Sequence, residues 1–223
     1  AESIPWLAEQ GLDVYFNMAN PKWAYDGHVN WLNAKLLQDP TRDAEALIQA
    51  YFDAFYGVAA EPMRAFFDRC EDIWMNQAGE AHWLRFYADA WQAILFTEAD
   101  IEELSALLKA AELLAREQVE PENPSSERYL KRVQLTQECW QLTRAFFAHR
   151  HGLFDIARAD SLEEVEAIEA EMPTEASIRE QAALLSITEP LHENFRKVNY
   201  LFRYDTRLSA YLSLWFRANE ADT

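Results

Sequence analysis

Apolar residues along most of the chain recur every three or four positions, the spacing of a helix with one buried face. In the first half, this pattern predicts helices over residues 4–10, 27–38 and 43–56. A further helix should carry Pro62 in its first turn and end near residue 77, and another should span 81–96. Asp39-Pro40 should end one helix because the residue before proline avoids the helical region. Gly57 can cap the next.

The same periodicity continues in the second half. Thr97 is placed to cap a helix that carries Ile101 and Leu104. The segment 120–126 is polar, contains two prolines and reads as a linker. Beyond it, Ser126 is predicted to cap a long helix that ends near Arg150. Ser161 and Glu164 match a capping box. Two further helices are expected over 175–186 and 190–218.

Residues 11–20 follow a different rule. Leu12, Val14, Phe16 and Met18 alternate with more polar residues, which is the period of a β-strand. A lone strand is not stable in water, so this one should pair with sheet that lies outside the sequence. No fixed repeat of about 34 or 40 residues occurs. The predicted fold is therefore mainly all-α, an irregular multi-helix bundle with one N-terminal β-strand.

Composition narrows the possible partners. The 223 residues are 50% hydrophobic and include 8 Trp and 13 Phe, which excludes a disordered tail. No apolar run reaches the roughly 18 residues of a membrane span, so no membrane association is expected. The formal charge of −18 repels phosphate backbones, which argues against nucleic acid as a partner.

The stretch from residue 30 to 67 resembles a region that follows the catalytic barrel in certain carbohydrate-active enzymes. Its segments read NWLNAKLLQDP, DAEALIQAYFDAFYG and AAEPMRAFF. The likeness is to an uncharacterised family with α-glucuronidase-like or hexosaminidase-like (β/α)8 barrels. In that pattern, helices end in Leu-Leu-Trp-Asp-Pro and in Tyr-Tyr-Gly-Pro. Here Gln38 stands in place of the tryptophan and Val58 in place of the proline. A looser likeness extends over residues 80–150.

The resemblance implies a division at residue 26. Residues 1–26 would be the terminal barrel strand with its following loop, and residues 27–223 the helical bundle, with a sub-boundary at 120–126. The two carboxylates of glycoside hydrolysis would lie on earlier strands, outside this chain. The chain would then be the C-terminal helical accessory part of a glycoside hydrolase, without catalytic residues or cofactors of its own. Its partner would be the barrel of the same polypeptide, in an extracytoplasmic location. The alternative is a stand-alone helical protein-interaction domain.

Candidate sugar-binding residues gather around the expected loop after the strand. Flat aromatic rings can stack on the apolar face of a sugar, while amides and carboxylates can bind its hydroxyls. The candidates are Asn17, Asn20, Trp23, Tyr25, Asp26 and His28. The competing interpretation is that Trp23 and Tyr25 only pack the first long helix against the strand.

Other reactive residue types suggest no site. His149 and His151 are two positions apart, about 200° around a helix, so they cannot share a ligand face. Placed near the predicted helix end, they would instead meet the negative end of its dipole. Cys70 and Cys139 do not fit a zinc motif and should be buried, although a single bridge between them is also open. No metal site is expected. The glutamates between residues 163 and 171 should form a solvated helix face.

Overall fold

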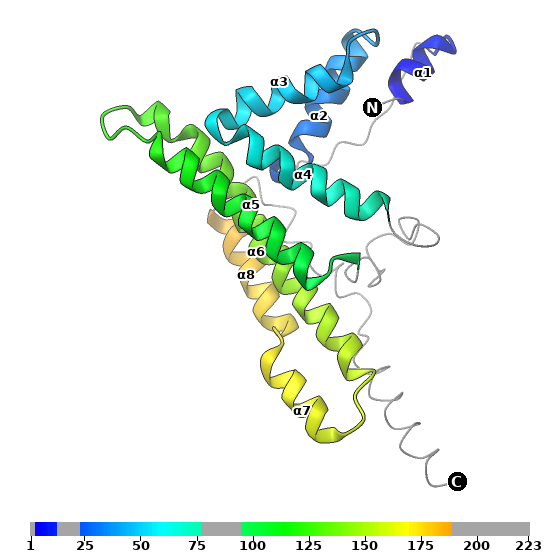
Figure 1. Cartoon of the computed structure of the whole chain (residues 1–223), viewed down its shortest axis with the longest axis vertical. Helices are drawn as coiled ribbons and strands as arrows, with labels where there is room; N and C mark the ends of the chain where they lie inside the picture. The colour runs from blue at the N-terminus through cyan, green and yellow to red at the C-terminus, as the bar shows by residue number, and fades with distance from the viewer. Residues whose placement is uncertain (1–2, 13–22, 77–94, 189–223) are drawn as a thin grey trace. The chain divides into compact units, whose positions relative to one another are not determined.

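The computed structural model describes residues 3–12, 23–76 and 95–188. Within these ranges the chain is mostly helical and contains no strand, which confirms the mainly all-α prediction (Figure 1). The helices are α1 (Ser3–Glu9), α2 (Trp23–Gln38), α3 (Ala44–Tyr56), α4 (Ala60–Met75), α5 (Glu98–Glu117), α6 (Arg128–Ile156), α7 (Leu162–Glu171) and α8 (Glu175–Thr188), with short 3-10 helices η1 (Gly57–Ala59) and η4 (Pro124–Glu127).

Three predicted elements fall largely or wholly outside the described residues. The strand at 11–20 is one of them, and only Gly11 and Leu12 of it are described; Gly11 lies in the turn that follows α1. The others are the helices over 81–96 and 190–218. These three elements stay predictions.

The chain divides into two compact units. The first comprises Ala1–Glu71 and Glu103–Cys139, and the second comprises Asp72–Glu102 and Trp140–Thr223. The divisions fall inside α4, α5 and α6, so each of these helices contributes residues to both units. The turn at 119–123 lies within the first unit, where it joins α5 to α6.

The helix ends around α3 are set by the residues that the sequence singled out. The Asp43 side chain caps the start of α3 by accepting hydrogen bonds from the backbone N–H groups of Glu45 and Ala46. Gly57 ends the helix with φ of +56°, a conformation that favours glycine. A Cβ atom at this position would lie 2.6 Å from the Tyr129 ring. Gly57 is thus required both by the backbone turn and by the close approach of α6.

Helix α2 begins earlier than predicted, at Trp23 rather than at residue 27. Most of the expected loop after the strand is therefore the first turn of a helix. The physical reason is that the buried face defined by Leu32 and Leu36 continues backward at spacings of four through His28 to Ala24, which is only 7% exposed. Extending the helix places more of this face against the core.

The predicted cap of α5 by Thr97 is confirmed. Thr97 Oγ1 accepts a hydrogen bond from the backbone N–H of Asp100, and the Asp100 carboxylate accepts one from the N–H of Thr97, at 3.2 and 2.9 Å. This is a reciprocal cap with aspartate in the place of glutamate. Ser161 caps α7 as expected, but Glu164 accepts from the N–H of Asp160 instead of that of Ser161.

Both predicted ends of α6 were wrong. Ser126 lies in η4, where its hydroxyl donates to the Asn123 carbonyl, and α6 itself starts at Arg128. The helix also passes through Gly152 to Ile156. It continues because Leu153 and Ile156 are buried with Val165 of α7, and burial of an apolar side chain outweighs the modest helix penalty of one glycine.

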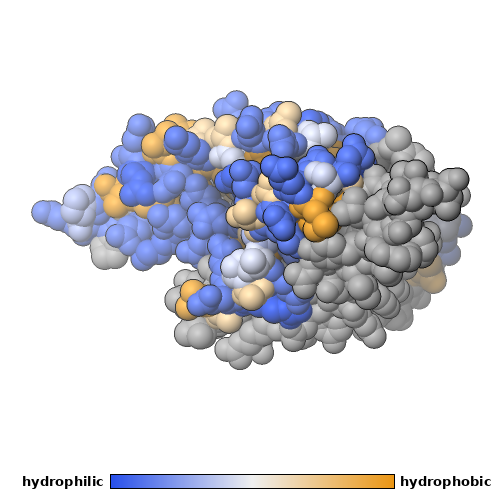
Figure 2. All heavy atoms as spheres, turned by 90° about the horizontal axis from the view of Figure 1, so that it is seen from below, coloured by the Kyte–Doolittle hydropathy of each residue, from blue (hydrophilic) through white to orange (hydrophobic). Residues whose placement is uncertain are grey.

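Each unit contains buried apolar clusters of its own. In the first, Ile4, Leu32, Leu36 and Leu47 join α1, α2 and α3. In the second, one cluster joins α6 to α8 and another joins the end of α6 to α7. On the face shown in Figure 2, hydrophilic residues cover most of the coloured surface, and hydrophobic residues appear in small separate groups. Among the described helices, none has the combination of length and apolar character needed to cross a bilayer.

Candidate functional site

The structure places the predicted sugar-binding residues on a helix wherever it describes them. Asn17 and Asn20 lie outside the described residues. Trp23 is the first residue of α2, and its side chain is not described. Tyr25 and Asp26 lie in the first turn of the helix and are half-buried.

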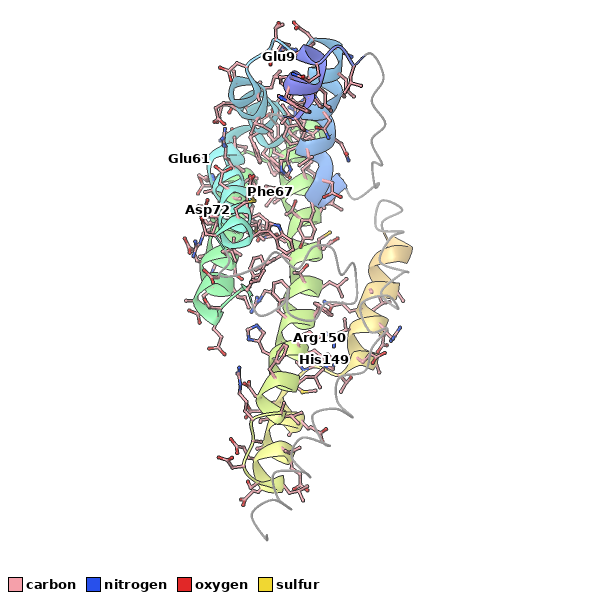
Figure 3. The ribbon with its side chains drawn as sticks, turned by 90° about the vertical axis from the view of Figure 1, so that its right-hand side faces the viewer. Glu9, Glu61, Phe67, Asp72, His149 and Arg150 are labelled. Atoms are coloured by element: carbon pink, nitrogen blue, oxygen red, sulfur yellow. The ribbon has the colours of Figure 1, made fainter. Side chains whose placement is uncertain are left out.

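His28 is half-buried and packs against aromatic rings of the first unit. Its ring centroid lies 4.6 Å from that of Phe67 on α4 and 5.7 Å from that of Phe52 on α3. Figure 3 labels Phe67 on α4, and Glu61 of the same helix is exposed. Burial lowers the pKa of His28 from 6.5 to about 4, although the nearby Asp68 carboxylate acts in the opposite direction. His28 is therefore neutral near pH 7 and its ring is engaged in packing.

Two polar residues of α2 lie away from the Leu32 side of the helix. Asp26 and Asn30 are one turn apart, on the opposite side of the helix from Leu32, and both are half-buried. The helix thus separates the candidates: His28 faces the core, whereas Asp26 shares a face with Asn30, which the sequence reasoning did not select. The i, i+4 spacing of Asp26 and Asn30 was the available signal, and it was hidden by the expectation of a loop.

Arg132 of α6 joins the third and sixth helices within the first unit. Its guanidinium donates a 2.7 Å hydrogen bond to the carbonyl of Phe55 and lies 4.2 Å from the centre of the Phe55 ring. The negative end of the α3 dipole also attracts a cation at this place. Tyr56, beside it, is buried with its hydroxyl 3.4 Å from Thr136 Oγ1, and burial raises the pKa of Tyr56 to about 12. Arg132 and Tyr56 therefore stabilise the packing of α3 against α6, and the Tyr56 hydroxyl stays protonated near pH 7.

The second unit contains a pocket of about 710 Å³ that the sequence did not suggest. Its walls come from the start of α5, the second half of α6 and the end of α7. The polar lining consists of Glu98, Glu102, Gln141, Arg144, His151, Asp155 and Glu171. These residues are spread over three helices, so no short motif in the sequence could reveal them.

His149 and His151 lie within α6 and not at its end, so the predicted contact with the helix terminus was wrong. The reason is the continuation of α6 to Ile156. His149 is 8% exposed, and its Nδ1–H donates a 2.8 Å hydrogen bond to the carbonyl of Pro173 (Figure 3). The neighbouring Arg150 guanidinium lies over the Phe146 ring at 5.2 Å. His151, on another side of the helix, lines the pocket.

Neither cysteine is suited to nucleophilic chemistry. Cys70 and Cys139 form no disulfide bond; Cys139 is buried and Cys70 half-buried. Burial raises the pKa of the Cys70 thiol to about 12 and that of Cys139 further. Both thiols are protonated near pH 7, and the thiolate is the reactive form.

Within the described ranges, no three His, Cys, Asp or Glu side chains come together in a group that could hold a metal ion. No protein-family model, curated protein or solved structure matches the chain. The functional assignment therefore depends on the residues themselves and on the geometry described above.

Proposed function

We propose that this chain is a non-catalytic, C-terminal helical domain that packs against the (β/α)8 barrel of a glycoside hydrolase. The supporting observation is the construction of the region that carries the family resemblance. The Asp39-Pro40 sequence separates α2 from α3, and Gly57 separates α3 from α4. The two substituted positions, Gln38 and Val58, leave both turns intact, since both side chains are exposed.

A second observation supports the same proposal. The resemblance is strongest over residues 30–67 and looser over residues 80–150, and the part of the second stretch that belongs to the first unit, residues 103–139, packs against the first stretch. Arg132 binds the Phe55 carbonyl, and Tyr129 covers Gly57. A family pattern spread over distant segments has a physical basis when those segments contact each other.

The role in this proposal is one of support. Among the described residues of the first unit, the histidine is neutral and half-buried, and both cysteine thiols are protonated. The start of α2, with Trp23, Tyr25 and Asp26, would then lie beside the sugar site of the barrel and contribute contacts to it. His28 is not included, because its ring packs on Phe67.

The test begins with the coding sequence upstream of this chain. The proposal expects about 250 residues with alternating strands and helices that carry a pair of carboxylates. If the upstream sequence encodes no barrel, the proposal fails and the alternative of a stand-alone helical interaction domain becomes the better one.

Point variants of the full-length enzyme then test the sugar contact. Trp23→Ala should weaken oligosaccharide binding by about 1–3 kcal/mol with little change in melting temperature. Trp31→Ala is the matched control, since the Trp31 ring packs 5.8 Å from that of Tyr51. The control should lower the melting temperature and leave affinity unchanged. A Trp23→Ala variant that behaves like the control would remove the sugar contact from the proposal.

A further inference from the structure

We infer that the pocket of the second unit binds a neutral, hydroxyl-rich ligand of the size of one or two sugar rings. This inference stands on the pocket alone and does not depend on the accessory role proposed above. The pocket has a volume of about 710 Å³, within the usual range of roughly 300–1,000 Å³ for small-molecule sites.

The first argument is the mixture of hydrogen-bonding groups. Arg144 offers only donors, whereas Glu98, Glu102, Asp155 and Glu171 offer only acceptors when ionised. Gln141 offers both. Among the residues that the structure describes, no ion pair joins Arg144 to any of these carboxylates, and all five side chains are exposed, so both kinds of group are open to a ligand.

The second argument distinguishes between ligand classes. A polyamine would bind the carboxylates but offers no acceptor to Arg144, and a phosphate or carboxylate ligand would bind Arg144 but offers no donor to the four acids. A hydroxyl group both donates and accepts, so it can bind a carboxylate and a guanidinium at the same time. A polyol is therefore the class that uses the whole polar lining.

The third argument is the apolar part of the wall. Ala145, Ala148 and Gly152 follow one another along α6 at spacings of three or four, and Ile168 and Met172 face the same pocket from α7 and the residue after it. Because Ala145, Ala148 and Gly152 are small, they form an apolar surface that protrudes little between the polar groups. A sugar ring has an apolar C–H face as well as hydroxyls, and such a wall can cover that face.

Gly152 keeps this wall in place. A Cβ atom there would lie 2.7 Å from Met172 Sδ, so any larger residue would push Met172 aside. The glycine thus allows α6 to approach the end of α7 closely, and the position of Met172 follows from it.

The test uses the purified full chain and isothermal titration calorimetry with maltose, cellobiose, spermidine and citrate as separate probes. We expect at least one of the two disaccharides to bind with a Kd of about 1–10 mM, and spermidine and citrate to bind at least tenfold more weakly. Neither disaccharide binding below about 50 mM would overturn the inference, and so would tighter binding of spermidine or citrate.

Two pocket variants sharpen the result. Arg144→Leu and Asp155→Leu should each raise the Kd of the bound disaccharide at least fivefold, because a hydroxyl ligand uses both donors and acceptors. Arg116→Leu, in the first unit, makes the same change in charge as Arg144→Leu and should leave the Kd unchanged. A disaccharide Kd that responds to Arg116→Leu as strongly as to Arg144→Leu would place binding outside the pocket. Retained helical circular dichroism establishes that each variant is folded.

Discussion

The two units of this protein bury their helices in different ways. The first relies on aromatic rings in mutual contact, as in the group formed by His28, Phe52 and Phe67. The second contains aliphatic clusters built on Leu142 and Ile178 and on Leu153 and Val165, beside a smaller aromatic group in which Phe147 packs against Phe96 and Trp140. In the first unit, large flat rings fill the space between three helices, whereas in the second unit Gly152 lets α6 approach the end of α7 closely.

The two units also differ in how accessible their polar groups are. In the first unit, the polar groups that lie deepest, such as the Tyr56 hydroxyl and the His28 ring, are packed and held in their neutral forms. In the second unit, carboxylates and a guanidinium line an open pocket. The first unit thus holds its deepest polar groups by packing, and the second unit offers the more accessible polar site.

The largest expected effect tests the aromatic core. Phe52→Ala should destabilise the protein by about 3–5 kcal/mol, because the residue is 1% exposed and its removal leaves a cavity among four rings. Trp140→Ala, at 4% exposure in the second unit, should cost a similar amount. Urea unfolding measures both. A cost below about 1 kcal/mol for Phe52→Ala would show that the rings are not tightly packed.

The second effect is a dependence on pH. The pKa of His28 is lowered to about 4 in the folded protein, so the unfolded chain binds the proton more tightly. The contribution of His28 to the free energy of unfolding is therefore fully present above pH 6.5. It decreases as the pH falls toward 4, by about 3 kcal/mol in total. Asp68 and Tyr51 also face this ring, and Asp68 reduces the effect.

The matched variant for this prediction is His28→Leu, which keeps an apolar group at the site and removes its titration. The difference in unfolding free energy between wild type and variant should change between pH 6.5 and 4 and remain constant above that interval. A ring titration near pH 6.5 in the NMR spectrum of the folded protein would instead place His28 in solvent.

The smallest effect concerns the turn between α3 and α4. Gly57→Ala should cost about 2–3 kcal/mol, from backbone strain at φ of +56° and from collision with the Tyr129 ring. Gly11→Ala is the control, because its φ is +78° but nothing lies within 4 Å of the new methyl group. The control isolates backbone strain at about 1 kcal/mol. Equal costs at the two sites, measured by thermal unfolding, would show that α6 does not press on this turn.

The sequence predicted the helices that have strong local signals at both ends. Asp43 and Gly57 bound α3 as expected, and Thr97 caps α5. It failed where a distant or competing contact overrides a local signal. Ser126 read as a helix cap, but its hydroxyl donates to the Asn123 carbonyl and α6 starts after it. Gly152 read as a helix end, yet α6 passes through it because Leu153 and Ile156 are buried. The loop predicted around Trp23 and Tyr25 became helix for the same reason.

The candidate sites show the same limit. His28 was selected for its chemical type, but packing against Phe67 makes it a core residue. The pocket residues were not selected, because Glu98, Arg144 and Glu171 are far apart in the sequence and meet only through the packing of three helices.

By itself, the sequence determined the helical class, most helix bounds and the turn chemistry of Asp39-Pro40 and Gly57, because these depend on interactions between residues a few positions apart. Only the tertiary structure decided the extent of α2 and α6, the neutral state of His28 and the existence of the pocket. Each of these depends on burial against a distant segment, and burial free energy is set by which surfaces meet in space rather than by the order of residues along the chain.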